Sequence, residues 1–239
     1  MLAASTRGDF LPGQAGNGGR AVALAHMTNA YILLGGLTGS LIDYPVNLGL
    51  LGLRRRLQQK NVICFTYPWG NWQRAGDDIA AHAGLAATIV IGHSGGGSRA
   101  TWLANWRNPP IDLMVLYDPS PVAQMRPVGR NVQRALCYHN TKPCMWWPGI
   151  GTLGGGMLLG PRVEVLDFAQ FHLLVQFNQT LHARTLAEVE KIQNSRGETK
   201  QTVAQGRTAS SQSPADGHAP VSQSRGGIGA SSPKWRSRR

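Results

Sequence analysis

The chain has 239 residues, of which 15% are charged, and a formal net charge of +12. This length allows one sizeable domain with flanking tails. No run of about 18 apolar residues occurs, which argues against a membrane-spanning helix, and the N-terminus lacks the apolar stretch of a signal peptide. We therefore expect a cytoplasmic protein.

Both ends of the chain differ in composition from the middle. Residues 1–26 are rich in Gly and Ala, and residues 194–239 are rich in Ser, Gly, Gln and Arg. Such segments bury too little apolar surface to offset their ordering entropy, so we expect both to be disordered. Met27, directly before the first predicted strand, is an alternative start of the chain. The C-terminal tail has eight Lys or Arg residues and two acidic ones, which is half of the net charge. No recognition helix or aromatic platform accompanies it, so specific nucleic-acid binding is not predicted.

Residues 27–193 alternate between strand-like and helix-like patterns. Strands are predicted at 30–36, 62–68, 86–92, 111–121, 132–140 and 162–168, and helices at 40–60 (interrupted near Pro45), 72–84, 96–106 and 171–193. This alternation predicts an α/β fold, with a mostly parallel central sheet of about six strands and helices on both faces. Ligands of such sheets bind beyond the carboxyl ends of the strands.

The third predicted strand ends in Gly92-His93-Ser94-Gly95-Gly96-Gly97, directly before a helix. A phosphate-binding P-loop needs Gly-Lys-Ser/Thr at its end, whereas Gly97 is followed by Ser98. A dinucleotide fingerprint needs glycine at its middle position, where Ser94 would obstruct a pyrophosphate. We therefore set both phosphate-binding interpretations aside.

Residues 92–96 match the pattern G-x-S-x-G between a strand and a helix, which is the context that presents a nucleophilic serine. A sharp turn there imposes strained backbone angles on Ser94 and raises its hydroxyl above the sheet edge. Neighbouring backbone leaves no room for a Cβ atom at Gly92 or Gly96, and the following helix N-terminus favours a developing oxyanion. The alternative is a glycine-rich turn with an incidental serine.

This motif, together with the segments VIGHSGGG, LMVLYDPSP and FAQFHLLV, makes residues 28–193 resemble the α/β-hydrolase superfamily. The resemblance implies a lipase-, esterase- or thioesterase-like serine hydrolase, with nucleophile, acid and histidine in that chain order. It implies Ser94 as nucleophile, Asp118 at the end of the fourth strand as acid, and His172 after the last strand as base. Asp167, near the end of the last strand, is the alternative acid.

Three further histidines lie near these positions. His139 ends the fifth predicted strand, where it would line a pocket. His182 lies within the terminal helix, where we expect an exposed or capping side chain. His93, next to the candidate nucleophile, is expected to pack rather than react.

The resemblance also implies an oxyanion hole formed by the N–H groups of Gly95 and Leu37, with Thr38 as the second choice for the latter. Each such donor contributes a factor on the order of 10²–10³ in rate. The implied mechanism requires neither a metal nor an organic cofactor.

Segments 121–131 and 141–161 are the substantial insertions at the predicted catalytic edge. Trp147 and Met157 in the second segment would cover a hydrophobic group, and Trp69 would form another pocket wall. The alternative is that the Gly-rich loop packs on the core. The extra antiparallel strands and the cap domain usual in the family are not evident, so we expect a compact version of the fold.

The three cysteines have different expected roles. Cys64 lies in a strand-like run and is expected to be a small core residue. Cys137 and Cys144 flank a short segment that a disulfide could close. Their spacing with His139 does not fit a structural zinc site.

The leading hypothesis is therefore a serine hydrolase that cleaves a carboxylic ester or thioester of a small-molecule or lipid-like substrate. One alternative is a non-catalytic protein of the same fold that binds a ligand or partner. Another is association with nucleic acid or an anionic surface through the basic tail.

Overall fold

The protein is described by a computed structural model. It describes residues 27–36, 47–121, 124–141, 146–147, 151–152, 155–158 and 160–210. By its internal contacts the chain divides into a unit that ends at Lys200 and a second that begins at Gln201. The predicted disordered segment 1–26 lies outside the described residues, as does most of the predicted tail.

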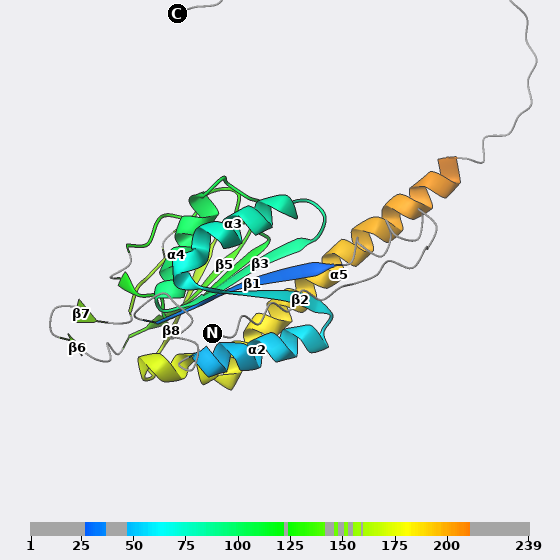
Figure 1. Cartoon of the computed structure of the whole chain (residues 1–239). Coiled ribbons are helices and arrows are strands. Elements are labelled where there is room, and N and C mark those ends of the chain that lie inside the picture. The colour runs from blue at the N-terminus through cyan, green and yellow to red at the C-terminus, as the bar shows by residue number, and fades with distance from the viewer. Residues whose placement is uncertain are drawn as a thin grey trace, which may run out of the picture. The chain divides into compact units, whose positions relative to one another are not determined.

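Six parallel strands form one sheet (Figure 1). In spatial order they are β2 (Val62–Pro68), β1 (Thr28–Leu34), β3 (Ala87–His93), β4 (Leu113–Tyr117), β5 (Ala135–Asn140) and β8 (Val163–Phe168). This confirms the predicted α/β fold and the number of strands in its sheet.

The central strands have the apolar, β-branched composition of strands that are covered on both faces. Every residue of β1 and of β3 is buried. Because side chains alternate along a strand, Ile32 packs into the core on one face and Leu33 into the core on the other.

Helices cover both faces of the sheet, α2 and α5 on one and α3 and α4 on the other (Figure 1). Their bounds are α2 (Leu48–Gln59), α3 (Trp72–Ala81), α4 (Gly95–Asn105) and α5 (Gln179–Ser210), and a 3-10 turn, η2 (Trp69–Asn71), precedes α3. The core on the first face includes Leu53 of α2 and Val189 of α5. The other core includes Ile79 of α3 and Leu103 of α4. Within the described part of the chain, none of the helices is both long and apolar enough to cross a membrane.

The predicted terminal helix differs most from the structure. Residues His172–Phe177 form a separate 3-10 helix, η4, and α5 begins only at Gln179. The physical reason is Asn178, whose side-chain oxygen accepts hydrogen bonds from the N–H groups of Thr180 and Leu181 at 3.0 and 3.2 Å. These bonds start a new helix after Asn178. The helix then continues to Ser210, beyond the predicted end at residue 193.

A short antiparallel pair that the sequence did not predict, β6 (Trp146–Trp147) and β7 (Gly151–Thr152), lies between β5 and β8 in the chain.

The strand order reverses next to β1. The chain runs from β1 outward to β2 and then returns to β3 on the other side of β1. In sheets of this kind, ligands bind where the strand order reverses, beyond the carboxyl ends of the two strands. Leu33 pairs with Gly92, so β1 and β3 end side by side, with Gly35 and Ser94 just beyond.

Candidate active site

Ser94 occupies a strained turn between β3 and α4. Its backbone angles are φ 54° and ψ −124°, which residues other than glycine rarely adopt. The glycines on either side are required for steric reasons. A Cβ atom on Gly92 would lie 2.5 Å from the carbonyl oxygen of Gly96, and one on Gly96 would lie 2.2 Å from that of Leu33. The chain can therefore make this turn, which brings Ser94 to the carboxyl edge of the sheet, only with glycine at both positions.

The structure brings Ser94, His172 and Asp118 together. His172 Nε2 lies 2.9 Å from Ser94 Oγ, and His172 Nδ1 lies 2.6 Å from Asp118 Oδ2. An ionised carboxylate only accepts hydrogen bonds, so His172 Nδ1–H donates to Asp118. The lone pair of Nε2 then accepts the hydrogen bond of the serine hydroxyl.

Asp118 is fully buried, yet it is held as a carboxylate by its donors. Burial by itself would raise its pKa. Hydrogen bonds from His172, from the N–H of Gly155 at 2.6 Å and from Asn140 Nδ2 at 3.2 Å outweigh burial and lower the pKa of Asp118 below its ordinary value. Asp118 is therefore ionised at neutral pH and faces the imidazole of His172.

The turns that carry the serine and the acid are joined through the backbone. Asp118, like Ser94, has a positive φ, 43°. The N–H of Ser120 donates to the carbonyl oxygen of Ser94 at 3.0 Å, and the N–H of Ser94 donates to that of Tyr117 at 3.1 Å. The separation between the serine and the acid is therefore set by backbone hydrogen bonds as well as by side chains.

Asp167, the alternative acid, lies elsewhere. Its side chain is 68% exposed and contacts His139 at 2.9 Å, whereas the contact between His172 and Asp118 is buried. His139, which we expected to line a pocket, thus pairs with Asp167 at the end of β8. Of the two acids, only Asp118 is bonded to His172.

The other two histidines are both buried. His93 packs as expected, because its ring stacks on that of His172 with centroids 5.0 Å apart and its Nε2 donates to the carbonyl oxygen of His172 at 3.3 Å. Burial lowers the pKa of His93 to about 3, so it stays neutral. The prediction for His182 was wrong: this residue is 2% exposed and packs against the ring of Tyr117, because α5 turns this face toward the sheet.

One of the two predicted oxyanion donors lies in the described part of the chain. Gly95 is the first residue of α4, and N–H groups in the first turn of a helix have no intrahelical partner. Leu37 and Thr38 lie outside the described residues, so their role stays a prediction. The segment before them passes close to the serine: a Cβ atom on Gly35 would lie 3.0 Å from that of Ser94.

Of the predicted pocket residues, Trp69 lies against the site. Its ring would be 3.6 Å from a Cβ atom on Gly95, and its Nε1–H donates to the carbonyl oxygen of Gly36 at 2.9 Å. Met157 is 48% exposed. Trp147 belongs to β6, but its side chain lies outside the described part of the structure.

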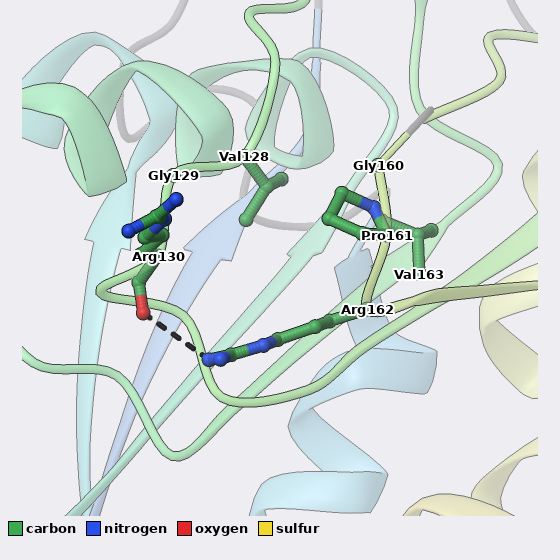
Figure 2. Close-up of a pocket in the computed structure, with 7 residues that line it drawn as sticks. All are labelled: Val128, Gly129, Arg130, Gly160, Pro161, Arg162 and Val163. Atoms are coloured by element: carbon green, nitrogen blue, oxygen red, sulfur yellow. Dashed lines mark hydrogen bonds between the residues drawn. The ribbon is translucent and has the colours of Figure 1, made fainter.

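A separate small cavity of about 150 Å³ lies away from these residues (Figure 2). It is lined by Val128, Arg130, Gly160, Arg162 and Val163, among others. Val163 is the first residue of β8, so this cavity lies at the amino ends of the strands. Because Ser94 follows the carboxyl end of β3, the cavity belongs to the opposite edge of the sheet.

Three residues that position the site were not predicted from the sequence. Asn140 and Gly155 bind Asp118, and Asn47 binds both the N–H and the carbonyl oxygen of Gly35 at 2.9 and 2.8 Å. The one available signal was the position of Asn140, a polar residue at the carboxyl end of a buried strand. Asn47 falls within the predicted helix 40–60 and Gly155 within segment 141–161, and no periodic pattern in the sequence connects either residue with the site.

Cysteine and metal chemistry receive little support in this region. Cys137 is a buried free thiol, so the disulfide considered for it is not formed; Cys144 lies outside the described residues. Burial raises the pKa of Cys137 to about 11, which keeps the thiol protonated and unreactive. Among the described residues, no group of His, Cys, Asp and Glu is arranged to hold a metal ion.

No protein-family model matches the chain, and no curated protein matches it in sequence. Among solved structures it is similar to a proposed hydrolase of the alpha/beta superfamily from Xanthomonas campestris pv. campestris, with 14% identity and a TM-score of 0.45. The match covers 70% of this chain and 99% of the other. Similarity of this extent says nothing about chemistry, so function has to be argued from the site.

Proposed function

We propose that this protein is a serine hydrolase that cleaves a carboxylic ester or thioester. The observation that carries the proposal is the buried hydrogen-bonded chain from Ser94 Oγ through His172 to Asp118, with distances of 2.9 and 2.6 Å. Three residues far apart in the sequence form this chain beyond the carboxyl ends of the strands, where ligands of such sheets bind. A merely structural cluster would not need a serine on a strained turn.

The reaction follows from the arrangement of these groups. Ser94 Oγ attacks the substrate carbonyl while His172 Nε2 takes its proton, and the negative charge moves to the carbonyl oxygen, where the Gly95 N–H donates. The intermediate collapses, the bond to the leaving group breaks, and His172 returns the proton to the departing alcohol or thiol. A water molecule then attacks the acyl-enzyme by the same route, which releases the acid and restores Ser94.

Asp118 has an electrostatic role in this scheme. Its carboxylate holds the Nδ1–H tautomer of His172 and stabilises the imidazolium that forms during each proton transfer. Asn140 and Gly155 hold the carboxylate in place. Exposed apolar side chains on either side of His172 would accommodate the organic part of an ester, namely Phe171, Leu173, Leu174 and Phe177.

The test is hydrolysis of a series of p-nitrophenyl esters with short to long acyl chains by the full chain and by its Ser94→Ala variant. We expect wild-type turnover and a loss of about 10³-fold or more in the variant, because no other nucleophile replaces the hydroxyl. Full activity of the variant would contradict the proposal. A folded wild type that neither hydrolyses esters nor reacts with an alkylphosphonate probe would favour the non-catalytic binding protein instead.

A further inference from the structure

A cluster of tryptophans and arginines covers the start of α4. The Arg99 guanidinium lies 5.5 Å from the ring centroid of Trp69 and 4.8 Å from that of Trp102. Arg126 lies over the same Trp102 ring at 3.8 Å. Two positively charged side chains therefore lie against one indole. Each cation is attracted to the aromatic ring, but the arrangement brings two like charges close together.

Neither arginine is neutralised by a carboxylate within the described residues. Arg99 Nε is buried and has no hydrogen-bond partner among them. Two arginines elsewhere are paired with acids: Arg107, which lies over Trp106 at 6.0 Å, contacts Asp77 at 2.8 Å, and Arg134 contacts Glu164 at 2.9 Å. A buried N–H donor without a partner costs free energy. The Nε atoms of Arg54 and Arg184 are also buried without a partner, so what distinguishes Arg99 is its place between two indoles.

The cluster lies at the same edge of the sheet as Ser94. Trp69 follows the carboxyl end of β2, and its ring packs against Gly95, the residue after the serine. Arg126 belongs to the segment after β4, which is attached to α4 by a hydrogen bond from Trp102 Nε1 to the carbonyl oxygen of Gln124 at 2.6 Å. Arg99 lies in the second turn of α4, and helical side chains point back toward the helix N-terminus. The indole of Trp69 contacts both sides of this arrangement: its ring lies 5.5 Å from the Arg99 guanidinium and would be 3.6 Å from a Cβ atom on Gly95, the proposed oxyanion donor.

We infer that Arg99, held between Trp69 and Trp102, binds an anionic group of the substrate, so that the preferred substrates are esters or thioesters that carry a carboxylate or phosphate. This inference rests on the proposed function and names its substrate class. A guanidinium offers two parallel N–H donors to a carboxylate or phosphate, and stacking on indole holds it ready to bind. Arg126 adds positive charge next to Arg99, and the inference does not require Arg126 to contact the anion.

The experiment compares mono-4-nitrophenyl adipate with 4-nitrophenyl hexanoate, which differ in the terminal carboxylate. We expect the full chain to prefer the adipate ester, and Arg99→Gln to lower the ratio of the two kcat/KM values by about 10- to 100-fold, because a hydrogen-bonded charge pair is lost. Arg99→Lys should retain part of the preference, since it keeps the charge. Arg107→Gln removes an arginine stacked on another tryptophan and should leave the ratio unchanged.

An equal ratio in the wild type and in Arg99→Gln would overturn the inference. If Arg99→Gln does not fold, as judged by circular dichroism, the experiment uses Arg99→Met instead, because this variant keeps an aliphatic side chain between the indoles. If the wild type cleaves neither ester, the alkylphosphonate probe tests the proposed function, and the anion site is tested separately by tryptophan fluorescence. Saturable quenching by adipate or by inorganic phosphate that Arg99→Gln abolishes would support the site and show which anion it prefers. No saturable change with either anion would contradict it.

Discussion

The two edges of the sheet differ in how far their polar side chains are buried and in what these side chains bond to. At the carboxyl edge, Ser94, Asp118 and His172 are buried and bonded to one another, and Arg99 has no acidic partner among the described residues. At the amino edge, several charged side chains are partly exposed and form ion pairs. Such pairs are Arg134 with Glu164 at 2.9 Å and Arg196 with Asp112 at 2.9 Å.

Under the proposed function, this difference separates polar groups that contribute to solubility and local stability from groups that take part in the reaction. Exposed ion pairs contribute about 0–1 kcal/mol each and can be lost at little cost. Buried polar groups cost free energy unless they are hydrogen-bonded, and strained turns cost free energy as well. Stability therefore does not explain why the fold keeps buried polar groups on strained turns. The small cavity at the amino edge has no such cluster among the residues that line it.

The largest effect should come from the acid of the carboxyl edge. We expect Asp118→Asn to lower kcat/KM for a p-nitrophenyl ester by about 10³- to 10⁴-fold, because an amide no longer enforces the Nδ1–H tautomer of His172 or stabilises its cation. Asp167→Asn is the matched control and should stay within about threefold of wild type, since this side chain is 68% exposed and bound to His139. A reversed order of the two variants would identify Asp167 as the acid.

The next prediction tests whether the turn at Ser94 needs its glycine. Gly96→Ala should destabilise the protein by about 3 kcal/mol or more, because the new Cβ atom would meet the carbonyl oxygen of Leu33 at 2.2 Å. Gly52→Ala, in α2 with open space around it, should stabilise the protein by about 0.5–1 kcal/mol through helix propensity. Urea unfolding of both variants measures the two effects. Similar effects for the two variants would show that backbone crowding at Gly96 is relieved elsewhere.

Buried histidines near the carboxyl edge should make stability depend on pH. Burial lowers the pKa of His182 to about 4 from an unfolded value near 6.5, so between these pH values the unfolded chain binds a proton that the folded chain does not. The free energy of unfolding therefore falls as pH drops from about 6.5 toward 4, by about 2 kcal/mol between pH 7 and pH 5 for this residue alone. His182→Leu should remove that part of the difference in urea unfolding at the two pH values. An unchanged difference would show that His182 is protonated in the folded protein.

The smallest effect is expected at the amino edge. Glu164→Gln removes the ion pairs of Glu164 with Arg134 and Arg184, whose side chains are 44% and 40% exposed. We expect a loss of about 0.5–1 kcal/mol in the free energy of unfolding, smaller at high salt, and unchanged ester hydrolysis. A large loss of activity would contradict the separation of roles between the two edges.

The sequence by itself determined the fold class and the order along the chain of the six strands of the sheet. Continuous apolar runs at β1 and β3, with glycines at their ends, predict buried parallel strands because local composition and periodicity reflect burial on both faces. It also singled out Ser94, because the spacing of Gly92 and Gly96 follows from crowding within one turn. Asp118 and His172 were chosen by resemblance, and the structure brings both of them to Ser94.

Only the tertiary structure decided what depends on contacts between distant segments. It distinguishes Asp118 from Asp167 by what each acid bonds to, buries His182 against the sheet, and brings Asn140 and Gly155 to the carboxylate. It also stacks Arg99 between Trp69 and Trp102, two residues from different elements. These pairings arise from packing between elements, and no pattern within a single element encodes which side chain of one will meet which side chain of another.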